Sequence, residues 1–296
     1  MTKQPSLRDR ALAFHALHIP GRPVILPNAW DTASARIVED TGAAAVATTS
    51  AGLAWGLGAA DGDRVDRERA LGVVADIAAA VDVPVSADVE SGFAVDPEGV
   101  ADTIRAVLAA GAVGVNIEDA LYEEGAGPLR DVSEQAERIA AARAAADAAD
   151  VPLFVNARVD TFLRGAGGVD RTLERAAAFR AAGADGIFVP GAVDPGTVKE
   201  LVDGVDGPLN IMVGPGAPPV AELAALGVAR VSSGAGIPMA VHALVRRAAR
   251  ELLDTGTYAS LADGYDYGGL NALLGGERRR PTTTRQMGVP SPAVPG

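Results

Sequence analysis

The chain has 296 residues, of which 48% are hydrophobic, and it carries a formal net charge of −12. It contains no cysteine, which excludes disulfides, thiolate metal ligands and a cysteine nucleophile. The acidic balance disfavours a nucleic-acid groove, and no apolar stretch is long enough to predict a membrane span. The first residues lack the apolar core of a secretory leader. We therefore expect a cytoplasmic protein that binds neither nucleic acid nor membranes.

A regular alternation of strand signals begins after an expected N-terminal helix over 5–18. Proline marks four strand entries, at 22–26, 83–85, 151–153 and 207–209. Glycine marks four others, at 41–46, 110–115, 182–187 and 226–231. The two kinds alternate strictly along the chain, and each glycine stands where a helix ends in a left-handed residue before the next strand.

Helical periodicity fills the spaces between these marks, over 66–80, 97–110, 133–149, 170–182 and 236–253. Eight strand–helix units predict an α/β fold of the (β/α)8 TIM-barrel type, and an open doubly wound sheet is the alternative. The predicted organisation is an N-terminal helix over 1–20, a barrel over 21–255, a helical extension over 256–276 and a disordered tail over 277–296.

Two connections are longer than the others and follow the second and fourth predicted strands. They cover 50–65 and 119–132, and both are rich in glycine. Loops of this length after barrel strands are often active-site lids, although they can also be merely loose. A further helical stretch is expected near 257–274.

Charged side chains end three consecutive predicted strands. Asp88 and Glu90 close the third, Glu118 the fourth and Arg158 the fifth. Residues two apart on a strand share a face, so Asp88 and Glu90 form a possible platform for Mg²⁺ or Mn²⁺. A single charged residue at the end of a strand is usually solvated at the edge of the sheet. Three consecutive strands that each end in a charged residue favour a ligand-binding site.

Other polar or small residues at strand ends complete the candidate site. They are Ser50, Ala51 and Gly52, which can offer backbone N–H groups, Asp61 in the following loop, and Asn116, Asn156 and Asn210. This set fits a hard cation chelated by an oxygen-rich carboxylate substrate, which the Arg158 guanidinium can bind in bidentate fashion. A salt bridge from Arg158 to Asp160 or Glu118 is the structural alternative.

The motifs A-D-V-E-S-G-F at 87–93, G-V-N-I-E-D at 114–119 and N-A-R-V-D at 156–160 resemble the isocitrate lyase/phosphoenolpyruvate mutase superfamily over roughly 20–255. The resemblance implies a barrel whose last helix is exchanged between subunits of a homodimer or homotetramer, with 236–274 as the exchanged segment. The roles it implies are Mg²⁺ organisation by Asp88, Glu90 and Glu118, a carboxylate clamp at Ser50, Ala51, Gly52 and Arg158, and contact of Asp61 with the reacting group.

Three departures from the family pattern restrict the reaction. Glu90 replaces the second aspartate of the strand motif, the Lys-x-Cys-Gly-His loop is absent from 120–131, and the mutase sequence Lys-Asn-Ser is missing.

Three hypotheses follow. The first is a Mg²⁺-dependent C–C lyase or decarboxylase acting on an oxaloacetate-like 2-oxo or 2-hydroxy dicarboxylate through an enolate. The second is a phosphonopyruvate mutase or hydrolase, and the third is a non-catalytic barrel that binds a 2-oxo acid.

Overall fold

The structure is a computed structural model that describes residues 5–122, 125 and 127–276. The chain divides into two compact units, 1–263 and 264–296. The strands of the first unit are β1 (Val24–Leu26), β2 (Asn28–Ala29), β3 (Val46–Thr48), β4 (Val85–Asp88), β5 (Gly114–Glu118), β6 (Phe154–Arg158), β7 (Gly186–Val189), β8 (Leu209–Met212) and β9 (Arg230–Ser232).

All the neighbouring strands pair in parallel, in the order β1-β9-β8-β7-β6-β5-β4-β3-β2. β1 and β2 are two parts of one strand on either side of Pro27, which has no backbone N–H to donate. One part pairs with β9 and the other with β3, so the sheet closes on itself. The predicted TIM-barrel fold is confirmed, and its first strand is divided.

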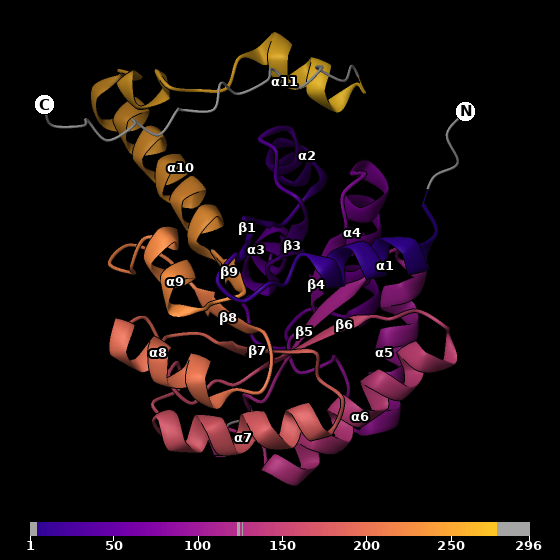
Figure 1. The fold of residues 1–296 in the computed structure, drawn as a ribbon. Helices are drawn as coiled ribbons and strands as arrows, with labels where there is room; N and C mark the ends of the chain where they lie inside the picture. Colours follow the sequence, from indigo (N-terminus) through magenta and orange to yellow (C-terminus); the bar gives the residue numbers. More distant parts are fainter. Residues whose placement is uncertain (1–4, 123–124, 126, 277–296) are drawn as a thin grey trace, which may run out of the picture. The chain divides into compact units, whose positions relative to one another are not determined.

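Helices connect successive strands and surround the barrel (Figure 1). They are α1 (Leu7–Ala16), α2 (Thr32–Asp40), α3 (Ser50–Gly56), α4 (Arg67–Ala80), α5 (Pro97–Ala109), α6 (Val132–Ala148), α7 (Val169–Ala181), α8 (Pro195–Gly204), α9 (Val220–Leu226) and α10 (Gly236–Thr255). Asp66, Asp96, Asp131 and Asp194 cap α4, α5, α6 and α8 by accepting first-turn N–H bonds. The five helices predicted from periodicity are all present within three residues at each end.

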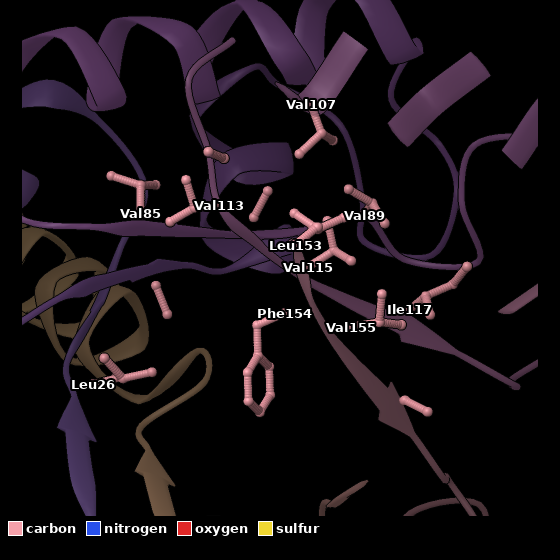
Figure 2. Close-up of a cluster of buried hydrophobic side chains, with 14 of the residues drawn as sticks. Leu26, Val85, Val89, Val107, Val113, Val115, Ile117, Leu153, Phe154 and Val155 are labelled. Carbon is pink, nitrogen blue, oxygen red and sulfur yellow. The ribbon is translucent and has the colours of Figure 1, made fainter. Parts of the chain in front are cut away.

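The main hydrophobic core lies between the outer face of the barrel and the helices. Figure 2 shows part of it, with Val85, Val115, Leu153 and Val155, all fully buried. Successive side chains on a strand point to opposite faces of the sheet. The strand residues next to these four valine and leucine residues therefore point into the barrel. That interior includes polar side chains, because Asn116 and Asn156 are buried there and hydrogen-bond to each other.

The N-terminal helix covers the end of the barrel at which the strands begin. Phe14 packs so closely on Gly114 that a Cβ there would lie 2.5 Å from its ring. His18 stacks on Phe154 with 3.8 Å between ring centroids, and its Nδ1 bonds the Phe14 carbonyl. These contacts place His18 in the core and leave the opposite end of the barrel for a ligand.

Among the described helices, none is long and apolar enough to cross a bilayer. The stretch predicted as helical near 257–274 contains a short 3-10 helix, Ala259–Leu261, in the first unit. The second unit contains α11 (Tyr267–Leu274), capped by Asp266. The predicted disordered tail at 277–296 lies outside the described residues.

Candidate functional site

A cavity of about 650 Å³ lies at the carboxyl ends of the barrel strands. Six of the residues predicted for the site line it: Ser50, Ala51, Asp61, Asp88, Asn116 and Arg158. Residues that the sequence did not single out also line it, among them Asn28, Phe188, Met212 and Ser233. The parallel strands explain the location, because all their carboxyl ends meet on one side of the barrel.

Asp88 is the strand-end carboxylate that lines this cavity, together with Asp61 from the loop after β3. Its backbone N–H donates to Thr48 Oγ1 at 2.9 Å, and its Oδ2 accepts the Ser50 N–H at 3.2 Å. Its Oδ1 is buried and has no hydrogen-bond partner among the described residues. Burial raises the pKa of Asp88, and the positive charge of Arg158 opposes that rise. Asp88 therefore has one oxygen free for a cation.

Glu118 is buried behind the cavity wall, with both carboxylate oxygens in contact with protein groups. Tyr122 Oη donates to Oε1 at 2.5 Å, and Arg158 Nη1 lies 2.5 Å from Oε2. The strand register explains the second contact, because Glu118 pairs directly with Arg158 across β5 and β6. Burial raises the pKa of Glu118, with the Arg158 charge acting against it.

Arg158 forms the structural salt bridges that the sequence left as the alternative. Its Nε and Nη2 donate to the two carboxylate oxygens of Asp160 at 2.7 and 2.8 Å. This fork leaves the Nε edge unavailable to a substrate. The side chain retains 13% exposure and lines the cavity, so part of the guanidinium borders the ligand space. Arg158 is thus both a structural residue and a candidate ligand contact.

Glu90 does not take the position beside Asp88 that strand alternation predicted. Its backbone is left-handed, with φ of 50°, so the chain has left the strand before this residue. Its carboxylate accepts the backbone N–H of Asp63, and the residue does not line the cavity. Burial raises the pKa of Glu90 to about 8. The two-residue spacing predicts that Asp88 and Glu90 share one face only if the strand continues through Glu90. Strand β4 ends at Asp88, so the prediction is wrong for Glu90.

Two other predicted contacts also lie outside the cavity wall. Gly52 belongs to the first turn of α3, and a Cβ there would lie 2.9 Å from both Thr49 and Trp30, so its role is close packing. The predicted loop over 50–65 therefore begins as a helix. Asn210 is buried, accepts a hydrogen bond from Asn156, and donates to Ser232 Oγ at 3.1 Å. The Asn210 amide therefore hydrogen-bonds to other side chains in the barrel interior and does not line the ligand cavity.

Arg230, at the start of β9, was missed by the sequence reasoning. It is 1% exposed, and its Nη2 donates to Asn116 Oδ1 at 3.2 Å and more weakly to Ser86 Oγ at 3.4 Å. Its Nε and Nη1 have no partner among the described residues. Burial lowers the pKa of Arg230 to about 9, while the Asp88 charge raises it. An arginine between Ala229 and Val231, in an otherwise apolar strand signal, matched no motif.

The two long connections meet beside the cavity. Tyr122, from the second connection, packs against Gly62 in the first, where a Cβ would lie 2.8 Å from its ring. In the second connection, Ala120 and Leu129 form an isolated antiparallel bridge. Residues 123, 124 and 126 lie outside the described part, so the prediction that these loops are mobile lids stays a prediction.

The residues present can accommodate Mg²⁺ at one carboxylate. In the described part of the chain, no three acidic or histidine side chains converge as a metal-binding group. The unpaired Oδ1 of Asp88 supplies a single hard oxygen ligand. Mg²⁺ is commonly held by one or two carboxylates, with water and substrate oxygens completing its octahedron. The fit is therefore to one direct protein ligand, and not to a platform of three acids.

The phosphoenolpyruvate phosphomutase family model matches residues 14–253. The chain is 32% identical to 2,3-dimethylmalate lyase of Eubacterium barkeri, over 69% of this chain and 72% of that protein. A crystal structure of a Burkholderia cenocepacia protein described as a candidate lyase or mutase has a TM-score of 0.83 and 40% identity, covering 90% of this chain and 95% of that one. A phosphonopyruvate hydrolase solved with oxalate and Mg²⁺ has a TM-score of 0.79 and 25% identity, with 90% and 95% coverage.

Proposed function

Because the chain belongs to the phosphoenolpyruvate phosphomutase family, within the isocitrate lyase/PEP mutase superfamily of lyases and mutases, we propose that it is a Mg²⁺-dependent lyase or decarboxylase. Its substrate is a small 2-oxo or 2-hydroxy dicarboxylate of the oxaloacetate type. The observation that carries the proposal is the placement of the unpaired Asp88 oxygen and the Arg158 guanidinium on one cavity wall.

The metal would be held by Asp88, with Glu90 and Glu118 acting through water from behind the wall. When bound, Mg²⁺ supplies Lewis-acid stabilisation of the enolate that forms beside the carbonyl. Mn²⁺ prefers the same hard oxygen ligands and can substitute. Support for this assignment comes from the buried, unpartnered Asp88 oxygen and from the Mg²⁺ and oxalate held together in the related hydrolase.

The side chains of the cavity bind the substrate and handle the proton. Arg158 and the Asn116 amide donate to carboxylate oxygens of the substrate. In the decarboxylation of oxaloacetate, the C3–C4 bond breaks, C4 leaves as carbon dioxide, and the electron pair enters the C2–C3 enolate. A proton then adds to C3 and gives pyruvate. Asp61, exposed at the cavity wall, is placed to exchange that proton with water.

The charge of the cavity disfavours the phosphonate alternative. A phosphonate dianion needs strong cationic recognition, and Arg158 is the sole cationic side chain among the described lining residues. Two carboxylates already neutralise it. The proposal therefore places a carboxylate, and not a phosphonyl group, next to the reacting carbon.

A coupled assay for pyruvate release tests the function. Oxaloacetate with Mg²⁺ is followed with and without protein, and the metal-only rate is subtracted. We expect turnover by the wild type, its loss in Asp88→Asn, and its retention in Asp203→Asn, an identical change on exposed α8. Calorimetric titration with oxalate tests the hypothesis of a non-catalytic barrel. Binding of oxalate without turnover of oxaloacetate would indicate a barrel that only binds 2-oxo acids. If the protein neither binds nor turns over any 2-oxo acid, the proposal is wrong.

We also propose that α10 mediates a homodimer or homotetramer. In this 20-residue helix only Pro238 and Ala248 are buried, whereas Val245 and Leu253 are 61% and 85% exposed. An apolar helix face left in water is typical of an interface. Light scattering on Val245→Asp should then report a smaller species than the wild type. An unchanged mass would contradict the assembly.

A further inference from the structure

The short segment that carries Asp61 is held mainly from outside itself. Asp61 lines the cavity and belongs to residues 60–65, between α3 and α4, and the described structure has neither helix nor strand there. In the described part of the chain, the hydrogen bonds of residues 60–65 go to Glu90 and Ser91, in the turn that follows β4. The position of Asp61 therefore depends on contacts with that turn.

The Glu90 side chain makes the main polar contact with this segment. Its Oε2 accepts the backbone N–H of Asp63. The second bond, from the Ser91 N–H to Asp63 Oδ1, is 3.4 Å long and therefore weak. Glu90 is only 3% exposed, so water has little access to compete for its carboxylate. The buried carboxylate thus connects the end of β4 to residue 63 of the segment.

Both partners of this hydrogen bond have a left-handed backbone. The φ angle is 54° at Asp63 and 50° at Glu90. Residues other than glycine populate this region sparsely, and they keep such a conformation where surrounding contacts hold it. The contact between Glu90 and Asp63 joins the two residues concerned. It is therefore the contact that fixes the path of the chain just after Asp61.

Tyr122 restrains the residue directly after Asp61. Its ring lies so close to Gly62 that a Cβ there would be 2.8 Å away, and its hydroxyl donates to Glu118 at 2.5 Å. Gly62 has a φ of 95°, which a residue with a side chain rarely adopts. Gly62 and Asp63 are thus both held by groups outside the segment, and Asp61 precedes them directly.

We propose that Glu90 is a positioning residue for Asp61, because its side chain holds residues 60–65 where the Asp61 carboxylate borders the cavity. This inference rests on the proposed lyase function, in which Asp61 exchanges a proton with water. The role depends on the length of the Glu90 side chain and not on its charge. Aspartate keeps the charge but is one methylene too short to reach the Asp63 N–H, whereas glutamine keeps the length and an accepting oxygen.

Two substitutions of Glu90 separate length from charge. We expect Glu90→Asp to lower kcat for oxaloacetate at least tenfold with KM within about twofold, because a misplaced reacting group slows the reaction without weakening substrate binding. Glu90→Gln should have a kcat at least fivefold higher than that of Glu90→Asp, since it keeps the accepting oxygen. Glu98→Asp is the matched control, because it shortens an exposed glutamate on α5 by the same methylene.

Hydrogen exchange and an Asp61 variant show whether the effect passes through residues 60–65. Glu90→Asp should accelerate amide exchange in this segment about tenfold, whereas Glu90→Gln and Asp61→Asn should leave it unchanged. Asp61→Asn should lower kcat at least as much as Glu90→Asp, because Glu90 acts only through Asp61.

Three results would overturn the inference while leaving the lyase function standing. The first is a kcat of Glu90→Gln equal to or below that of Glu90→Asp, which would assign the role to charge near the metal. The second is unchanged exchange of residues 60–65 in Glu90→Asp, and the third is a smaller loss of kcat in Asp61→Asn than in Glu90→Asp. A wild type without turnover would instead overturn the lyase function.

Discussion

Arg230 fixes the orientation of the Asn116 amide. Its Nη2 lies 3.2 Å from Asn116 Oδ1, which also accepts a hydrogen bond from Asn156 at 2.8 Å. A guanidinium can only donate, so the oxygen of this amide must face Arg230. The Asn116 Nδ2 is then left to face the cavity, where it is available to a carboxylate.

Replacing Arg230 should therefore change ligand binding more than stability. Arg230→Met removes the donor that orients Asn116 but keeps a long apolar chain. Because two of its buried nitrogens have no partner in the described part of the chain, we expect the free energy of unfolding to stay equal or to rise by ~1–4 kcal/mol. The KM for the 2-oxo acid should rise severalfold with a smaller change in kcat. A large drop in melting temperature with KM unchanged would show that Arg230 only stabilises the barrel.

Asp88→Asn should separate metal binding from stability. The carboxylate is buried, which raises its pKa, so removing its charge should leave the metal-free protein equally or more stable. The wild type should gain about 2.7 kcal/mol of stability at a Mg²⁺ concentration 100 times Kd, and the variant should gain none. Thermal unfolding with and without Mg²⁺ measures both. An equal Mg²⁺-dependent rise in the two proteins would place the metal elsewhere.

Arg158→Lys should lower both stability and binding. Lysine keeps the charge but cannot form the two-bond fork to Asp160, so we expect a loss of ~1–3 kcal/mol in unfolding free energy. Binding of 2-oxo acids should weaken by on the order of 2–4 kcal/mol. Arg143→Lys is the control, since Arg143 pairs with Asp185 away from the cavity. Chemical denaturation and calorimetry measure the two effects, and unchanged binding would make Arg158 purely structural.

Titration of His18 should make an unfavourable contribution to stability in mild acid, opposite in sign to that of Glu90, whose pKa burial raises to about 8. Burial against Phe154 lowers the pKa of His18 from 6.5 to about 3. The unfolded chain therefore binds a proton below pH 6.5 that the folded chain excludes, and this contribution to stability decreases as the pH falls towards 3. At pH 5 this contribution amounts to about 2 kcal/mol relative to pH 7. From pH 7 to pH 5, the urea-unfolding free energy of His18→Phe should rise by about 2 kcal/mol relative to that of the wild type, and an equal pH dependence of the two proteins would assign the effect to other groups.

Patterns along the chain are enough to predict the barrel and the end of it that holds the site. Alternating proline and glycine marks gave the eight strand–helix units, and the division at Pro27 did not alter the ring. Strand-end residues such as Asp88 and Arg158 indicated the cavity, because parallel strands bring their carboxyl ends together whatever else the chain does. Local periodicity carries this information, and so no knowledge of distant contacts was needed.

Which of these residues line the cavity depends on contacts between distant parts of the chain. Glu90 turned away because the chain becomes left-handed after Asp88, and Glu118 is engaged because strand register sets it opposite Arg158. Arg230 entered the site through Asn116, 114 positions away in the chain. Such pairings depend on distances across the barrel between strands far apart in sequence. Spacing along one strand cannot encode them, and the burial that raises or lowers each pKa exists only after the barrel closes.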